Sequence, residues 1–557
     1  MKSTLACAIF FASVYSTLGY SALDRVTDFA LLDDVGVFHQ LSRYQHTDAV
    51  ALMSFDQTCE SMPLMLAQYN SIVKEFSDHD IEFLLIDSVD LGREALVSLG
   101  LDIPILEDDG QLVSESLGIE NAGEVFLLNP ERLSLYFRGP VSMELRDSLS
   151  SLQSIQDTLE FEAMECNIEY PVKIAHELKT PDYATEIAPI IIENCAACHS
   201  QGGVGPFAFD SYIMLLGWSP MIREVLLNKR MPPMQVDPYI GYSDKARYLD
   251  VEQQQALIHW IDAGAPQGQS VIDPLENFSA EEENGWVLGE PDYIVLANSH
   301  DVPPTGVLDY IYDKVELPFE EDKWLRAVEY KAGDSAVLHH LMTFVTETNE
   351  DFWGKERNQT SVTRRFVESY SPGRGNVKIF EKGTGVFIPK GSDLSMQFHY
   401  VTNGQRTTDT SMLGLYFSEE KDLSERLVQA VSARFVLPPH EPNYELKTEY
   451  VFESRVVLTG VRARMNYRGK RMKFSIEKPS GIVEDIFSIP AYNYGWQPHY
   501  TLKEPITLDA GTKVHVTGAL DNSISNPTNP DPEKEVTFGL NSWDEMFTGY
   551  FTFYKAR

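Results

Sequence analysis

Residues 195–199 read Cys-Ala-Ala-Cys-His, the spacing that attaches a c-type haem to a protein. In this motif two thiols form thioether bonds to the porphyrin, and the histidine supplies one axial ligand of the iron. The motif therefore predicts haem c on Cys195 and Cys198, with His199 as the proximal ligand. A helical fold large enough to bury a porphyrin must surround it.

Three further histidines lie in two apolar segments, residues 337–342 and 394–400, that are typical of β-strands. The side chains of His339, His340 and His399 would suit a copper ion if the two strands were neighbours. Successive residues of a strand point to opposite faces, so His339 or His340 can also be interpreted as a hydrogen-bonded core residue.

The remaining cysteines are Cys7, Cys59 and Cys166. Cys7 falls in the amino-terminal apolar segment, which leaves Cys59 and Cys166 as one disulfide or as two separate thiols. Cys59 follows a predicted strand and begins a predicted helix, a position that lowers a thiol pKa and makes it a candidate catalytic residue. No second cysteine stands near it in the sequence, so we favour a structural or docking role.

The amino terminus has the pattern of a signal peptide. Lys2 precedes an apolar run from Leu5 to Leu18, and small residues follow at Ser21 and Ala22. The run is shorter than the roughly 20 residues that span a bilayer. We therefore expect residues 1–22 to be removed, no membrane span, and a periplasmic or secreted protein.

Length and charge restrict the class further. A chain of 557 residues suggests about three or four domains. With 45 Lys and Arg against 83 Asp and Glu, the formal net charge is −38, which argues against nucleic acid as a partner. The acidity favours solubility and also suits a basic redox partner protein.

The segment over residues 23–160 alternates strand and helix patterns. Residues 49–55, 81–87 and 124–129 are predicted strands, and a helix is predicted over residues 61–76. This α/β region resembles the redoxin branch of the thioredoxin fold, with Cys59 in the place of the reactive cysteine. It departs from that family at Gly123, where a cis-proline is usual.

After a linker over residues 161–182, residues 183–270 are predicted to be all-α. One helix ends in the haem motif, and an amphipathic helix covers residues 251–263. The region resembles a small cytochrome c. The resemblance implies that Met231 is the distal iron ligand, with Met234 as the alternative.

A second linker covers residues 271–290, and the rest of the chain is predicted to form many short strands. Examples are residues 394–400, 451–459 and 513–520. We expect two antiparallel, jelly-roll-like sandwiches over residues 291–435 and 436–557.

This half of the chain resembles the copper type II, ascorbate-dependent monooxygenases, and most closely their bacterial branch with redoxin and cytochrome c segments. The resemblance rests on short motifs: Trp324-Leu325-Arg326, His339-His340, Tyr370-Ser371-Pro372-Gly373, His399-Tyr400, Tyr467-Arg468-Gly469-Lys470, Trp496-Gln497, Asp521-Asn522-Ser523 and Trp543-Asp544-Glu545-Met546. It implies that His339, His340 and His399 hold an electron-passing copper.

The second, oxygen-activating copper of that family takes two histidines and a methionine. Met546 matches the methionine, but Arg464 and Asn466 stand in place of the histidines. A guanidinium cannot ligate a metal and places a positive charge where the cation would lie. We expect this copper to be absent unless His499 or His515 substitutes for the lost ligands.

Two classes of function remain open. In the first, the chain is an electron carrier with haem c or a non-catalytic partner of a paralogous subunit whose copper site is intact. The alternative is an active copper- and haem-dependent monooxygenase acting on a small or peptide-like substrate. The sequence does not decide whether the chain is an enzyme, and it names neither the substrate nor the oligomeric state.

Overall fold

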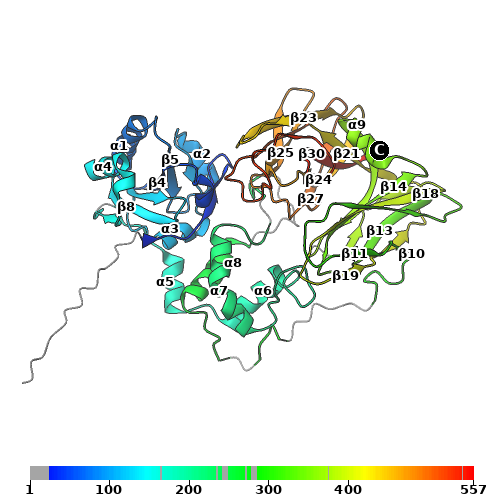
Figure 1. The fold of residues 1–557 in the computed structure, drawn as a ribbon, viewed down its shortest axis with the longest axis horizontal. Helices are drawn as coiled ribbons and strands as arrows, with labels where there is room; N and C mark the ends of the chain where they lie inside the picture. Colours follow the sequence, from blue (N-terminus) through cyan, green and yellow to red (C-terminus); the bar gives the residue numbers. More distant parts are fainter. Residues whose placement is uncertain are drawn as a thin grey trace, which may run out of the picture.

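The computed structural model describes residues 24–163, 166–233, 236–240, 249–269, 272–276, 285–373, 376–541 and 543–556. The predicted signal peptide over residues 1–22 and the alternative iron ligand Met234 lie outside these ranges. An α/β domain, a helical region and a β-rich half follow one another along the chain (Figure 1).

The amino-terminal domain is thioredoxin-like. Its seven-stranded sheet has the order β1-β8-β7-β4-β5-β6, with β9 beside β8. Strand β4 is parallel to β5 and antiparallel to β7. The three predicted strands are confirmed within this sheet. The elements are β1 (Asp24–Arg25), β2 (Ala30–Leu32), β3 (Phe38–Gln40), β4 (Ala49–Phe55), α1 (Met62–Glu75), β5 (Ile81–Asp87), α2 (Arg93–Leu99), β6 (Ile105–Leu106), α3 (Leu112–Leu117), β7 (Glu124–Asn129), β8 (Ser134–Pro140), α4 (Met143–Ser150) and β9 (Leu159–Glu160).

A disulfide joins Cys59 to Cys166, so the sulfur that follows β4 is paired. Two backbone hydrogen bonds join the same segments. The Ala122 amide donates to the Cys166 carbonyl and the Ile168 amide donates to the Glu120 carbonyl, each at 2.9 Å. The segment after the domain is thereby fixed beside the start of α1.

In its described residues, the helical region contains four helices and one short helical turn, Tyr183–Ile187. The helices are α5 (Pro171–Leu178), α6 (Ala188–Asn194), α7 (Tyr212–Leu227) and α8 (Val251–Asp262). The predicted helix over residues 251–263 is confirmed as α8, which begins with a capping box between Asp250 and Gln253.

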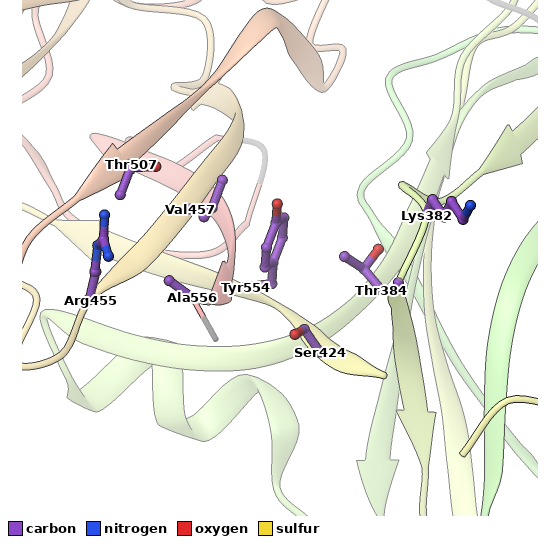
Figure 2. A pocket seen from close by; sticks show the side chains of 9 residues that line it. Lys382, Thr384, Ser424, Arg455, Val457, Thr507, Tyr554 and Ala556 are labelled. Carbon is purple, nitrogen blue, oxygen red and sulfur yellow. The ribbon is translucent and has the colours of Figure 1, made fainter. Parts of the chain in front are cut away.

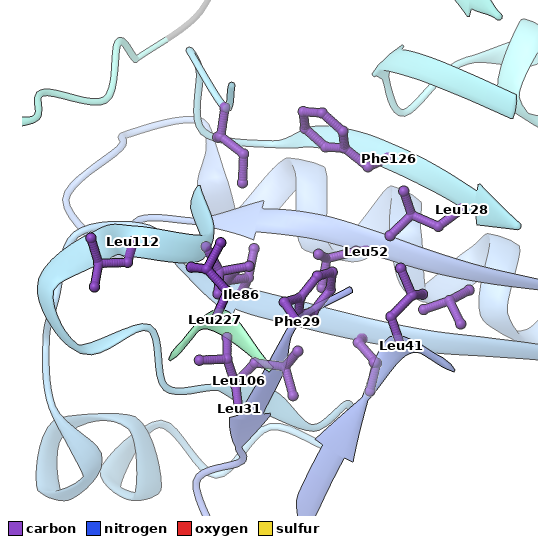
Figure 3. Close-up of a cluster of buried hydrophobic side chains, with 14 of the residues drawn as sticks. Phe29, Leu31, Leu41, Leu52, Ile86, Leu106, Leu112, Phe126, Leu128 and Leu227 are labelled. Carbon is purple, nitrogen blue, oxygen red and sulfur yellow. The ribbon is translucent and has the colours of Figure 1, made fainter. Parts of the chain in front are cut away.

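This helical region shares one hydrophobic core with the thioredoxin-like domain. Leu227 of α7 lies among Leu31 of β2, Ile86 of β5 and Leu106 of β6 (Figure 3). The side chain of Gln255 also donates to the Gly110 carbonyl at 2.9 Å. The two parts are therefore packed together and do not have separate cores.

The β-rich half contains a 13-stranded sheet and a four-stranded sheet of order β23-β28-β25-β26. We call residues 291–435 the first β-region and residues 436–557 the second β-region. The strands of the first are β10 (Tyr293–Leu296), β11 (His300–Val302), β12 (Ile311–Glu316), β13 (Lys323–Lys331), β14 (Leu338–Glu347), β15 (Ser361–Tyr370), β16 (Val377–Ile379), β17 (Thr384–Ile388), β18 (Ser392–Tyr400), β19 (Thr407–Asp409), β20 (Met412–Phe417) and β21 (Ser424–Ser432), with helix α9 (Phe352–Asn358).

The strands of the second β-region are β22 (Val436–Leu437), β23 (Tyr444–Val451), β24 (Val456–Arg464), β25 (Gly469–Glu477), β26 (Val483–Ile489), β27 (Tyr500–Leu508), β28 (Lys513–Leu520), β29 (Val536–Thr537) and β30 (Thr548–Lys555). The two regions were expected as separate sandwiches, but β21 pairs with β15 on one side and with β30 on the other. One sheet therefore crosses the expected boundary.

The predicted strand over residues 451–459 is wrong. Strand β23 ends at Val451 and β24 begins at Val456, with a bend between them. The polar residues Glu453, Ser454 and Arg455 interrupt the apolar pattern at this bend. The predicted strands over residues 394–400 and 513–520 are confirmed as β18 and β28.

Within the described residues, no helix is long and apolar enough to cross a bilayer.

The disulfide gives a testable prediction about stability. Replacing Cys59 or Cys166 by serine opens a loop with a sequence separation of 107 residues. Because the cross-link restricts the unfolded chain, each variant is expected to lose about 2–4 kcal/mol of unfolding free energy. Denaturant unfolding without reductant measures this loss. The double variant should lose no more than either single one, and additive losses would contradict the prediction.

Candidate functional site

The three predicted copper ligands come together at the edge of the first β-region. The Nδ1 atoms of His339 and His340 lie 3.3 Å apart, and so do those of His339 and His399. A metal–nitrogen bond of about 2.0 Å separates neighbouring ligand nitrogens by roughly 3.3–3.5 Å. Among the described residues, these three form the one group of His, Cys, Asp or Glu side chains spaced to hold a metal ion.

A β-bulge brings the two adjacent histidines to the same side. Leu338 pairs with Tyr400 and His340 pairs with His399, so the register between β14 and β18 shifts at His339. The extra residue breaks the alternation that would otherwise separate the two side chains. The bulge therefore removes the geometric objection to His339 and His340 sharing one ligand set.

Burial keeps the three imidazoles neutral. It lowers the pKa of His399 to about 3, with His339 and Arg464 adding to the shift. It also lowers the pKa of His339 and takes that of His340 well below the usual range. A neutral imidazole is the form that ligates a metal, so protons compete little for this site at pH 7.

The second β-region covers the histidine triad with the loop Asn493–Trp496. A ring N–H of His339 donates to the Gly495 carbonyl. The Tyr494 hydroxyl lies 3.4 Å from His399 Nε2. These contacts hold the rings so that the Nδ1 atoms face one another. Sequence reasoning missed both residues, because no spacing links them to the triad.

The predicted haem motif forms a turn after α6. The His199 amide donates to the Cys195 carbonyl at 3.0 Å, and Gly205 donates to that of Cys198 at 2.9 Å. Both cysteines are outside the disulfide. Burial raises the pKa of Cys195 to about 12, which makes it a poor nucleophile for thiol exchange.

The surroundings of His199 fit an axial iron ligand. Its Nδ1 lies 3.1 Å from the Phe207 carbonyl, an arrangement that leaves the Nε2 lone pair for a metal. The ring packs against Phe207 and Phe209, and Phe207 stacks on Trp218 at 4.1 Å. Apolar aromatic surface of this kind suits a porphyrin. The predicted distal ligand Met231 follows α7 and is 41% exposed.

The haem motif contacts the β-region that carries the triad. A Cβ placed on Gly373 would lie 2.7 Å from Cys198 Sγ, and Gly373 has a φ of +73°. Only glycine meets both conditions without strain. Close by, the Ser335 hydroxyl donates to the Gly202 carbonyl at 2.7 Å.

Arg464 and Asn466, which the resemblance to copper monooxygenases implies stand in place of histidine ligands, make other contacts. Arg464 is buried, with its guanidinium carbon 4.9 Å from the centre of the Tyr310 ring and Nη1 3.8 Å from Met342 Sδ. The Asn466 amide donates to the carbonyls of Asn541 and Asp544 at 3.0 and 3.1 Å. A fixed cation and an engaged amide make this a poor place for copper.

The two histidines proposed as substitute copper ligands, His499 and His515, are hydrogen-bonded to other residues. His499 Nε2 lies 2.8 Å from the Thr552 hydroxyl, and His515 Nε2 lies 2.9 Å from Glu477. Met546 is buried, and its amide donates to Glu545 at 2.9 Å. The methionine is thus inside the fold, and the histidines at the two substitute positions are bonded to other residues.

A pocket of about 380 Å³ lies away from both candidate sites, at the outer seam between the two β-regions (Figure 2). It contains two cationic side chains, Lys382 and Arg455, beside the hydroxyls of Thr384, Ser424 and Tyr554. Arg455 is already paired with Asp509 at 3.3 Å. The lining includes no metal ligand or thiol, so the pocket adds no redox chemistry.

No family model matches the sequence, and no curated protein matches it. Solved structures give remote similarities. A hypothetical protein from Sinorhizobium meliloti is 20% identical, with 27% of this chain and 94% of that chain covered and a TM-score of 0.24. A peroxidoxin from Mycobacterium tuberculosis is 17% identical, with 25% of this chain and 99% of that chain covered and a TM-score of 0.21. A mitochondrial 2-Cys peroxiredoxin from Plasmodium falciparum is 12% identical, with 24% of this chain and 93% of that chain covered and a TM-score of 0.21. Similarities this remote do not decide the function.

The loop over the triad gives the second prediction. Replacing Tyr494 by phenylalanine removes the hydroxyl beside His399 Nε2, and copper affinity is expected to fall about 10- to 100-fold. Competition with a chelator of known affinity measures this change. In the control, Tyr312→Phe removes a hydroxyl that accepts from Gln397, so its copper affinity should be unchanged. Equal losses in both variants would contradict the role of Tyr494.

Proposed function

We propose that this chain is an exported electron-transfer protein that carries haem c and a single copper ion. Cys195 and Cys198 would attach the haem, His199 would ligate its iron, and His339, His340 and His399 would hold the copper. When bound, the haem supplies one-electron chemistry. The observation that carries the proposal is the direct contact between the haem motif and the β-region that holds the triad.

That contact places the two candidate sites on adjoining backbone. Gly373, which touches Cys198, comes three residues after Tyr370. Tyr370 pairs with Leu341, and Leu341 is bonded to the copper ligand His340. His340 and His399 are buried, and Cys195, Cys198 and His199 are partly buried. A protein that passes electrons between two centres needs them close together, and the adjoining backbone supports this role.

The residues around each site would fix its ligands. The Phe207 carbonyl orients His199, and the Tyr494–Gly495 loop orients His399 and His339. Rigid ligands that need no rearrangement suit an ion that changes its oxidation state without changing its coordination.

Hydroxylation by this chain alone is the weaker candidate. The resemblance to copper monooxygenases implies it, but Arg464 and Asn466 leave Met546 without imidazole partners. An electron carrier, or a non-catalytic partner of a paralogous subunit with an intact site, therefore fits the chain better than a monooxygenase. The Cys59–Cys166 disulfide supports the exported location, because such bonds persist in oxidising compartments.

Metal content tests the proposal. Purified holoprotein is expected to contain one iron and one copper per chain, because only the triad offers three imidazoles. His399→Ala should abolish the copper and leave the iron unchanged, and His499→Ala should change neither. Elemental analysis of the three proteins measures this. Two copper ions in the unmodified chain, or no iron, would contradict the proposal.

The distal iron ligand has its own test. Met231→Leu removes the proposed thioether, so the low-spin absorption spectrum of the haem protein is expected to change and the reduction potential to fall. Met221→Leu changes another half-exposed methionine of the same region and serves as the matched control. An unchanged spectrum in Met231→Leu would contradict this assignment and leave Met234 as the candidate.

A further inference from the structure

Two arginines project from one face of β24 into the interior of the β-rich half. Arg462 and Arg464 are two residues apart on the strand, so their side chains share a face. They are 1% and 2% exposed. Arg464 reaches Met342 of β14, and Met342 shares a face with His340 by the same two-residue spacing. Two cations of the second β-region thus face a strand that carries a proposed copper ligand.

Several hydrogen-bond donors in this place have no acceptor. They are Nε, Nη1 and Nη2 of Arg462, Nε of Arg464 and Nε2 of His340, all of which are buried in the described structure. If His340 binds copper through Nδ1, its Nε2 carries a hydrogen and must donate. A buried charge or N–H group without an acceptor strongly destabilises the folded state.

The nearest carboxylates do not supply the missing acceptors. Glu356 acts on Arg464 but is bonded to Arg364 at 3.2 Å. Glu368 is bonded to Arg426 at 3.3 Å. The strand opposite Arg462 contributes Tyr550, whose hydroxyl is neutral because burial raises its pKa to about 12. An excess of positive charge therefore remains beside His340.

We propose that Arg462, Arg464 and His340 bind a small inorganic anion of halide size, such as chloride, in the interior between the two β-regions. The anion would accept from the guanidinium groups and from His340 Nε2 at once. A water molecule could accept hydrogen bonds there, but it would leave both charges uncompensated. The nearly complete burial of the three side chains excludes a bulky ligand.

The anion would link the copper site to the second β-region. A negative charge beside the His340 N–H makes the ring a more basic ligand, as a carboxylate does in other metal sites. The inference rests on the proposed function only through the hydrogen on His340 Nε2. The two arginines require an anion whether or not copper is bound.

Crystals of the holoprotein grown in bromide test the site directly. Anomalous scattering is expected to show a bromide ion within hydrogen-bond distance of Arg462, Arg464 and His340 Nε2. Water or no density at this place, or bromide on the surface alone as an adventitious ion only, would overturn the proposal. The anomalous signal of copper in the same crystals tests the proposed function separately.

Stability in solution gives an independent test. Bromide should raise the unfolding temperature of the holoprotein saturably, because an ion that binds the folded state stabilises it. Arg462→Met should lose this response. Arg426→Met removes a buried arginine that is paired with Glu368, and it should keep the response. An unchanged response in Arg462→Met would overturn the proposal. Should that variant fail to fold, the bromide position in the unmodified protein decides.

Discussion

The candidate copper site depends on one irregularity in a strand pair. The bulge between Leu338 and His340 turns two adjacent imidazoles toward the same side, where His399 on the paired strand completes the triad. A regular register would have sent His339 and His340 to opposite faces, and no group of three would exist. The covering loop from the second β-region meets rings that this bulge has placed. The interface between the two β-regions is thus organised around the bulge.

A second constraint comes from the contact of the haem motif with the same β-region. Because Gly373 has no Cβ, Cys198 can approach the turn after β15 closely. The left-handed φ of this residue also favours glycine. The helical region is in turn fixed to the thioredoxin-like domain by a shared core. The disulfided domain therefore acts as a rigid support that holds the haem motif against the β-rich half. This role needs no catalytic thiol at Cys59.

The sequence predicted the parts of this arrangement that depend on local pattern. Continuous apolar runs identified β4 and β5, and residue type identified the three histidines that the structure brings together. Tyr494, Gly495 and Arg462 were not predicted, because their contacts join positions far apart in the chain. The pairing of β21 with β30 was missed for the same reason, since pairing partners leave no periodic signal in either strand. The bend after β23 was missed because apolar residues stand on both sides of it.

Arg464 gives the interface between the two β-regions a positive charge, as a metal ion would, but with a different chemistry. A copper ion is a cation held by neutral ligands, and Arg464 brings a permanent positive charge to the same strand. Unlike copper, a guanidinium carries hydrogens that require acceptors. Tyr310 offers Arg464 only the face of its ring, and the neighbouring Arg462 adds a second charge without an acceptor. The described interior has an excess of hydrogen-bond donors beside two guanidinium groups, and such an interior favours an anion.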